Sequence, residues 1–133
     1  MSRPRHHSSA APLAAIFAAL VVYASLYPFN DWRALNANPF AFLALPATRW
    51  WTGFDVSVNV LGYMPLGAVF FGALVRSGVP PRKSVRNAWL MAVVLSLCME
   101  LTQNLLPRRV ASSVDLALNA IGAGLGIMLA LTV

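Results

Sequence analysis

The stretch FDVSVNVLGYMPLGAVFFGALV, residues Phe54–Val75, decides the fold of this chain. A helix of about 20 apolar residues crosses the roughly 30 Å hydrocarbon core of a bilayer, and this stretch is long enough to do so. A backbone inside lipid must satisfy its own hydrogen bonds, so a spanning segment of this length forms a helix. Asp55 and Asn59 lie near its start. Polar side chains are costly inside a membrane helix, so their presence indicates a role. The sequence therefore predicts a membrane helix whose N-terminal end carries polar side chains.

The composition of the whole chain supports the same interpretation. Of its 133 residues, 59% are hydrophobic and 11% charged, and the mean hydropathy is +0.67. A soluble domain of this size needs more polar surface to cover its core. We predict an all-α, polytopic membrane protein with four transmembrane helices at about residues 10–27, 54–75, 88–106 and 114–133. They form a single domain, residues 10–133, which follows a basic cytoplasmic tail, residues 1–9.

The first apolar segment has a second interpretation. Basic residues before it and Val22-Tyr23-Ala24 near its end would also suit a cleaved signal peptide. Against this, the apolar run continues into Leu26-Tyr27-Pro28, as expected of a retained helix that ends at the membrane interface. The connection 30–53 is broken by prolines and rich in aromatic residues, which suits the headgroup region. We therefore expect a retained helix followed by an interfacial loop.

Basic residues set the expected orientation in the cell membrane. With the N-terminus inside, the tail and the connection 76–87 place six basic residues on the inner side and leave four outside. The positive-inside rule then puts both termini of this multi-pass protein in the cytoplasm. The formal net charge of +6 does not indicate a nucleic-acid partner, because the basic residues are not interleaved with aromatic residues on a polar face. Membrane lipids are the expected surroundings.

Three ionisable residues lie inside the predicted spans, namely Asp55, Glu100 and Asp115. A charged side chain there costs about 2.5–3.5 kcal/mol on insertion scales, so its presence indicates a role. Each has an amide three or four residues later, the spacing of one helical face. In an up-down arrangement all three pairs lie toward the same membrane face, which the expected orientation makes the outer one. We predict a ligand-binding or functional polar cluster formed by Asp55, Asn59, Glu100, Gln103, Arg109, Asp115 and Asn119.

A hydrogen-bonded clasp that only holds the helices together is the alternative for this cluster. Interhelical hydrogen bonds average only about 0.6 kcal/mol, which barely offsets the burial of carboxylates, so we favour a functional site. Ion pairs with Arg108 and Arg109 would reduce that cost. Oxygen ligands suit hard cations, but no histidine lies within the predicted spans, so we predict no metal and no cofactor.

The second and fourth predicted helices repeat each other. Asp55, Asn59 and Gly62 recur with the spacing of Asp115, Asn119 and Gly122. The repeat predicts two antiparallel hairpins in parallel repeat, with their polar faces meeting. Small residues let helices approach closely in lipid, and a proline kinks a helix. We assign to helix packing Pro65, Gly62, Gly67, Gly122 and Gly126. The glycine faces would also serve a homo-oligomer.

Taken in chain order, these motifs resemble the VanZ-like family. The similarity covers about residues 54–128 and consists of Asp55-x-x-x-Asn59, Met64-Pro65-Leu66-Gly67, Glu100-x-x-Gln103, and Arg109 with Asp115-x-x-x-Asn119-x-x-Gly122. The family pattern often has acidic residues where this chain has Ser112 and Val114. The resemblance implies a membrane protein with a helper role at the cell envelope, and the founding member of the family is associated with teicoplanin resistance.

The leading functional hypothesis is a cell-envelope binding or helper module. Its carboxylates and amides would bind a cationic or hydroxyl-rich headgroup near the outer leaflet, such as an envelope glycolipid or a cell-wall precursor. The alternative is an intramembrane enzyme that acts on a lipid-linked substrate, with Glu100 or Asp115 as general acid or base. An assembly subunit and a proton-coupled transporter are further alternatives that the sequence leaves open.

Overall fold

A computed structural model describes residues 9–35, 38–44 and 52–133 of the chain. Within these ranges the chain is all-helical, and the prediction of an all-α fold with four helices is confirmed. The elements are α1 (Ala10–Leu26), the short 3₁₀ helix η1 (Ala41–Leu43), α2 (Gly53–Arg76), α3 (Pro81–Gln103) and α4 (Ser113–Leu131). The predicted basic tail, apart from Ser9, lies outside the described residues.

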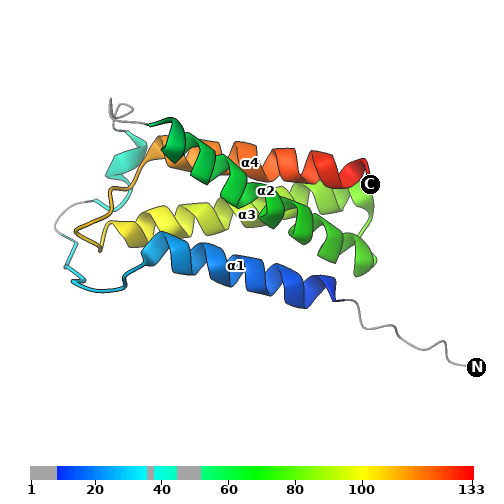
Figure 1. Cartoon of the computed structure of the whole chain (residues 1–133), viewed down its shortest axis with the longest axis horizontal. Coiled ribbons are helices and arrows are strands. Elements are labelled where there is room, and N and C mark those ends of the chain that lie inside the picture. The colour runs from blue at the N-terminus through cyan, green and yellow to red at the C-terminus, as the bar shows by residue number, and fades with distance from the viewer. Residues whose placement is uncertain (1–8, 36–37, 45–51) are drawn as a thin grey trace, which may run out of the picture.

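Three of the helices, α2, α3 and α4, are long and apolar enough to cross a membrane. Helix α1 is apolar too, and its 17 residues lie at the lower end of the range of about 17–25 that a span needs. The helices lie side by side and the chain reverses direction from each to the next (Figure 1). The ends of α1 and α3 and the starts of α2 and α4 therefore meet at one end of the bundle, which we call the loop end.

Helix α3 begins at Pro81 rather than near residue 88. Proline suits the first helical position, because its fixed φ matches the helix and its missing N–H would find no partner there. The first turns of α3 carry Arg82, Lys83 and Arg86, which hydropathy alone assigns to a connection. Hydropathy marks the apolar part of a helix, so it misses a polar first turn.

The closest helix contact joins α2 and α4. Gly67, Gly122 and Gly126 lie in it, and a Cβ atom at any of these positions would overlap backbone atoms of the opposite helix. Gly62 does not take part in this contact, because a Cβ there would meet nothing within 4 Å. Pro65 lies inside α2, which continues through it to Arg76. Since α2 pairs most closely with α4 and not within a predicted hairpin, the division into two hairpins stays a prediction.

The outer surface of the bundle is apolar, as a membrane protein requires. Large side chains such as Leu61, Val94 and Met128 are more than half exposed, with exposed fractions of 62%, 56% and 64%. The core between the helices is small in comparison, and Leu66 and Ile127 are its largest fully buried apolar residues. The small residues Ala88 and Ala92 of α3 are also fully buried, which brings α3 close to its neighbours.

Candidate functional site

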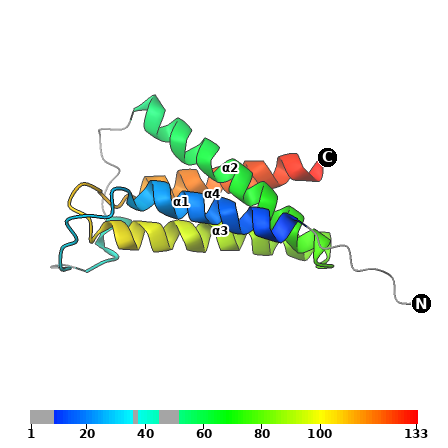
Figure 2. The same ribbon diagram turned by 60° about the horizontal axis from the view of Figure 1, so that its bottom comes forward.

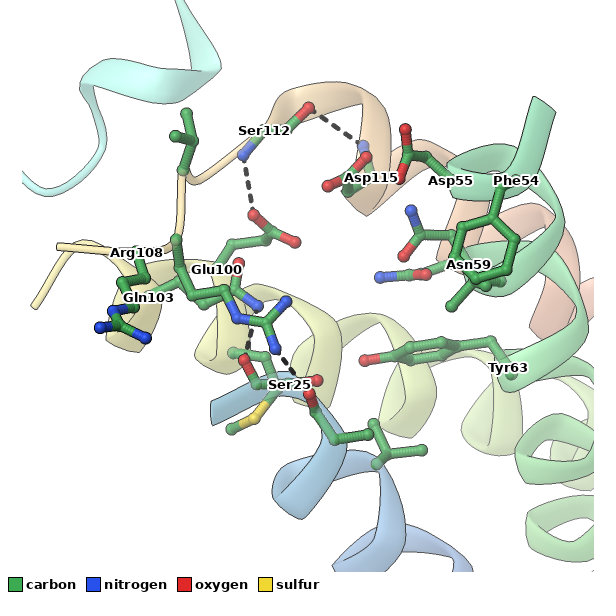
Figure 3. A pocket seen from close by; sticks show the side chains of 18 residues that line it. Ser25, Phe54, Asp55, Asn59, Tyr63, Glu100, Gln103, Arg108, Ser112 and Asp115 are labelled. Carbon is green, nitrogen blue, oxygen red and sulfur yellow. Dashed lines mark hydrogen bonds between the residues drawn. The ribbon is translucent and has the colours of Figure 1, made fainter. Parts of the chain in front are cut away.

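A polar cavity of about 480 Å³ lies at the loop end of the bundle. All four helices and the connection between α3 and α4 contribute to its walls. The structure brings together in this cavity all seven residues of the predicted polar cluster: Asp55, Asn59, Glu100, Gln103, Arg109, Asp115 and Asn119. Figure 3 shows side chains from α2 and α4 facing those from α3 across a common space. We call this cavity the polar pocket.

The two aspartates occupy equivalent positions at the starts of α2 and α4. Asp55 forms a capping box with Thr52, in which the Asp55 N–H donates to Thr52 Oγ1 at 3.1 Å and the Thr52 N–H donates to Asp55 Oδ2 at 3.0 Å. At the start of α4, the hydroxyl oxygen of Ser112 accepts from the N–H groups of Val114 and Asp115 at 3.2 and 3.3 Å. The repeat between α2 and α4 therefore reflects, in part, the same kind of N-terminal cap on each helix. A negative side chain at this position is also stabilised by the helix dipole.

Glu100 is the most deeply buried acid of the pocket, with 3% of its surface exposed. One carboxylate oxygen, Oε2, accepts from the backbone N–H of Ser112 at 2.8 Å. Figure 3 shows the carboxylate lying between Ser112 and the interior of the pocket, on the side of Asp115. The bond fixes the orientation of the side chain, and the other carboxylate oxygen makes no hydrogen bond within the described part of the chain.

Tyr63 and Asn119 lie deeper in the pocket, toward the middle of the helices. Asn119 donates from Nδ2 to the hydroxyl oxygen of the buried Ser96 at 2.9 Å. Its Oδ1 atom and the hydroxyl of Tyr63 are buried and have no hydrogen-bond partner among the residues that the structure describes. We call these two side chains the pocket floor.

Arg109 and Gln103 connect the pocket to α1 through backbone carbonyls. The Arg109 Nη2 atom donates to the carbonyl oxygens of Ala24 and Tyr27 at 3.1 and 3.2 Å, and Gln103 Nε2 donates to that of Ser25 at 3.1 Å. The last carbonyls of a helix lack partners inside it, and these side chains supply them. The expected ion pairs are not formed, since no Arg–carboxylate contact within 4.0 Å occurs in the described ranges. Arg108 is exposed and lines the pocket without a hydrogen bond to any described residue.

Among the described residues, no group of three or more His, Cys, Asp or Glu side chains is placed to hold an ion. Cys98, the one cysteine of the chain, is exposed on the outside of α3.

Two residues of the site, Tyr63 and Ser112, were not assigned to it by the sequence. Tyr63 lies four residues after Asn59, so helical spacing placed it on the same face. Ser112 precedes Asp115 by three residues at the start of an apolar run, which is a helix-capping pattern. Both signals were present, but a tyrosine in an apolar helix more often packs against neighbours than lines a site.

The chain matches the model of a protein family described as VanZ/LLP1 over residues 6–133. The match extends the resemblance of the motifs to α1 and so covers essentially the whole chain. No match was found among curated proteins or among solved structures.

Proposed function

The chain belongs to the VanZ/LLP1 family of membrane proteins, and on this premise we propose that its polar pocket binds the headgroup of a lipid or of a lipid-linked cell-wall precursor. Such a protein would act as a binding or helper module of the cell envelope.

The observation that carries the proposal is an excess of hydrogen-bond acceptors in the pocket. Asp55, Glu100 and Asp115 line one cavity together with Asn119, whose Oδ1 has no partner among the described residues. Two arginines also line the pocket: Arg109 is bonded through Nη2 to carbonyls of α1, and Arg108 is exposed. A ligand that complements these walls brings its own donors, which means hydroxyl or ammonium groups.

The position of the pocket favours a headgroup over a wholly apolar ligand. Around the loop end, exposed aromatic side chains gather, as they do where a protein meets the lipid headgroups. They include Tyr23, Tyr27, Trp32, Phe40 and Phe54. A ligand in the pocket would therefore hold its polar part at the level of the headgroups and leave an attached chain in the lipid.

The proposed orientation places the loop end on the outer side of the membrane. Basic residues gather at the opposite end, in the turn after α2 and the first turns of α3. With Cys98→Ala as background, a single cysteine at Ser113 should react with an impermeant maleimide in intact cells, and one at Ser77 should not. The reverse pattern would place the pocket on the cytoplasmic side and direct the search to a cytosolic ligand.

Lipid binding can be tested with the purified protein by native mass spectrometry. We expect lipids with donor-bearing headgroups to remain bound, and the triple variant Asp55→Asn, Glu100→Gln, Asp115→Asn to lose them. Asp31→Asn is the matched control, since Asp31 is the one other acid of the chain and lies exposed outside the pocket. Equal lipid retention by the triple variant and by the control would contradict the proposal.

A second candidate, an enzyme acting on a lipid-linked substrate, is favoured by the geometry of Glu100. Its carboxylate is buried and held by the Ser112 N–H, with one oxygen left for the pocket, which is the arrangement of a general acid or base. Turnover of a lipid-linked substrate that is lost in Glu100→Gln but kept in Asp31→Asn would establish this activity. Absence of turnover across a panel of envelope lipids would remove it.

A further inference from the structure

We propose that the pocket floor, formed by Tyr63 and Asn119, is a subsite for a hydrogen-bond donor of the ligand, either the N–H of a primary ammonium or the O–H of a hydroxyl group. The inference rests on the proposed function and adds to it the chemical group that the deepest part of the pocket selects.

Both side chains of the floor are buried and unsatisfied. Tyr63 is 5% exposed and Asn119 is 4% exposed. In the described part of the chain Asn119 Oδ1 has no hydrogen-bond partner, and the Tyr63 hydroxyl lies beside Ser96 without forming a hydrogen bond of good geometry to it. A buried polar atom without a partner costs about 1–3 kcal/mol, and folded proteins contain few of them. Both residues line the polar pocket, so a partner for these two atoms would enter through that cavity.

The floor is held in place before any ligand arrives. The bond from Asn119 Nδ2 to Ser96, at 2.9 Å, fixes the amide plane and therefore the direction of Oδ1. Figure 3 shows the ring of Tyr63 extending from α2 into the pocket, with its hydroxyl directed toward the side of α3. Groups fixed in this way lose little freedom on binding, which favours affinity.

The chemistry of the floor selects donors over acceptors. An amide oxygen only accepts hydrogen bonds, and a tyrosine hydroxyl accepts as well as donates. Above the floor, the carboxylates of Glu100 and Asp115 line the same pocket and favour positive charge over negative charge. A primary ammonium or a hydroxyl satisfies these groups, whereas a quaternary ammonium carries the charge but has no N–H to donate.

The test compares three phospholipids that share a phosphate and differ in the headgroup donor. Purified protein is titrated in nanodiscs with phosphatidylethanolamine, phosphatidylglycerol or phosphatidylcholine as guest lipid, and bound lipid is measured by native mass spectrometry. We expect phosphatidylethanolamine or phosphatidylglycerol, or both, to bind more tightly than phosphatidylcholine. The first would identify ammonium and the second hydroxyl as the preferred donor. Tyr63→Phe should reduce that preference about 2- to 10-fold, as loss of one hydrogen bond does.

Thermal unfolding in lipid-free detergent provides a second readout, because a structural role of the Tyr63 hydroxyl would make Tyr63→Phe less stable. Because the Tyr63 hydroxyl forms no hydrogen bond among the described residues, Tyr63→Phe should leave stability unchanged or raise it, as should the exposed control Tyr23→Phe. A loss of stability in Tyr63→Phe, an unchanged lipid preference in that variant, or equal binding of the three lipids by the wild type would overturn the subsite. If Tyr63→Phe has no effect while the triple carboxylate variant loses lipid, the subsite fails and the proposed function stands. The opposite pair of results would retain the subsite and reject the role of the carboxylates.

Discussion

Replacing Gly126 by alanine tests whether the contact between α2 and α4 holds the bundle together. In the structure a Cβ at Gly126 would overlap the carbonyl group of Met64, which belongs to the α2 backbone and cannot rotate away. The two helices must therefore separate or shift along each other. Gly72→Ala is the matched control, because a Cβ there would meet nothing within 4 Å.

The expected magnitude follows from two opposing effects. Alanine is favoured over glycine inside a helix by about 0.5–1 kcal/mol, and both variants gain this. Overpacking a close contact costs about 1–3 kcal/mol, and only Gly126→Ala incurs it. We therefore expect Gly72→Ala to be neutral or slightly stabilising, and Gly126→Ala to be less stable than this control by about 1–3 kcal/mol.

Both variants can be compared by thermal unfolding of the purified protein in one detergent, followed by the loss of helical circular dichroism. A lower midpoint for Gly126→Ala alone supports the contact. If Gly126→Ala unfolds at the same temperature as Gly72→Ala or higher, the helices do not approach as described, and the assignment of Gly126 to helix packing is wrong.

Three further variants probe the loop end of the bundle. Arg109→Ala should destabilise the fold by about 1–2 kcal/mol, because two carbonyls at the end of α1 lose their donor, whereas Arg108→Ala should have little effect in the same unfolding assay. Ser112→Ala should cost about 1 kcal/mol through the lost cap of α4, and Ser112→Thr should restore most of it; an equal loss in both would show that capping is not the cause. Thr52→Ala should speed amide hydrogen exchange in the first turn of α2 with a similar cost, and unchanged exchange there would contradict the capping box.

Helical spacing and the alternation of helix direction together predicted that the polar residues of α2, α3 and α4 lie at one end of the bundle. A period of 3.6 residues places Asp55 with Asn59 and Asp115 with Asn119 on single faces, whatever the rest of the fold does. The alternation of helix direction then brings Glu100, near the end of α3, to the level of the two helix starts. The helical period and the alternation of helix direction are both regular, so both can be derived from the sequence.

Contacts made by the loops could not be predicted in the same way. Arg109 was expected to pair with a carboxylate, but the path of the connection after α3 directs it to the carbonyls of Ala24 and Tyr27. The backbone N–H of Ser112 reaches Glu100 for the same reason. A backbone group has no signature in the sequence, so its partner is known only once the chain path is known.

The glycine contact has a mechanical consequence for the pocket. Gly122 lies against Val60 and Gly126 against Met64, so α2 and α4 touch along a short segment and separate toward their starts (Figure 2). Asp55 and Asp115 are about 8–10 Å along the helix axes from this segment, at 1.5 Å per residue. If the crossing angle between α2 and α4 changed by about 10° at this contact, the two aspartates would move by about 1–2 Å relative to each other. The separation of the two aspartates therefore depends on the angle at which the backbones of α2 and α4 cross, at a distance from the side chains that line the pocket.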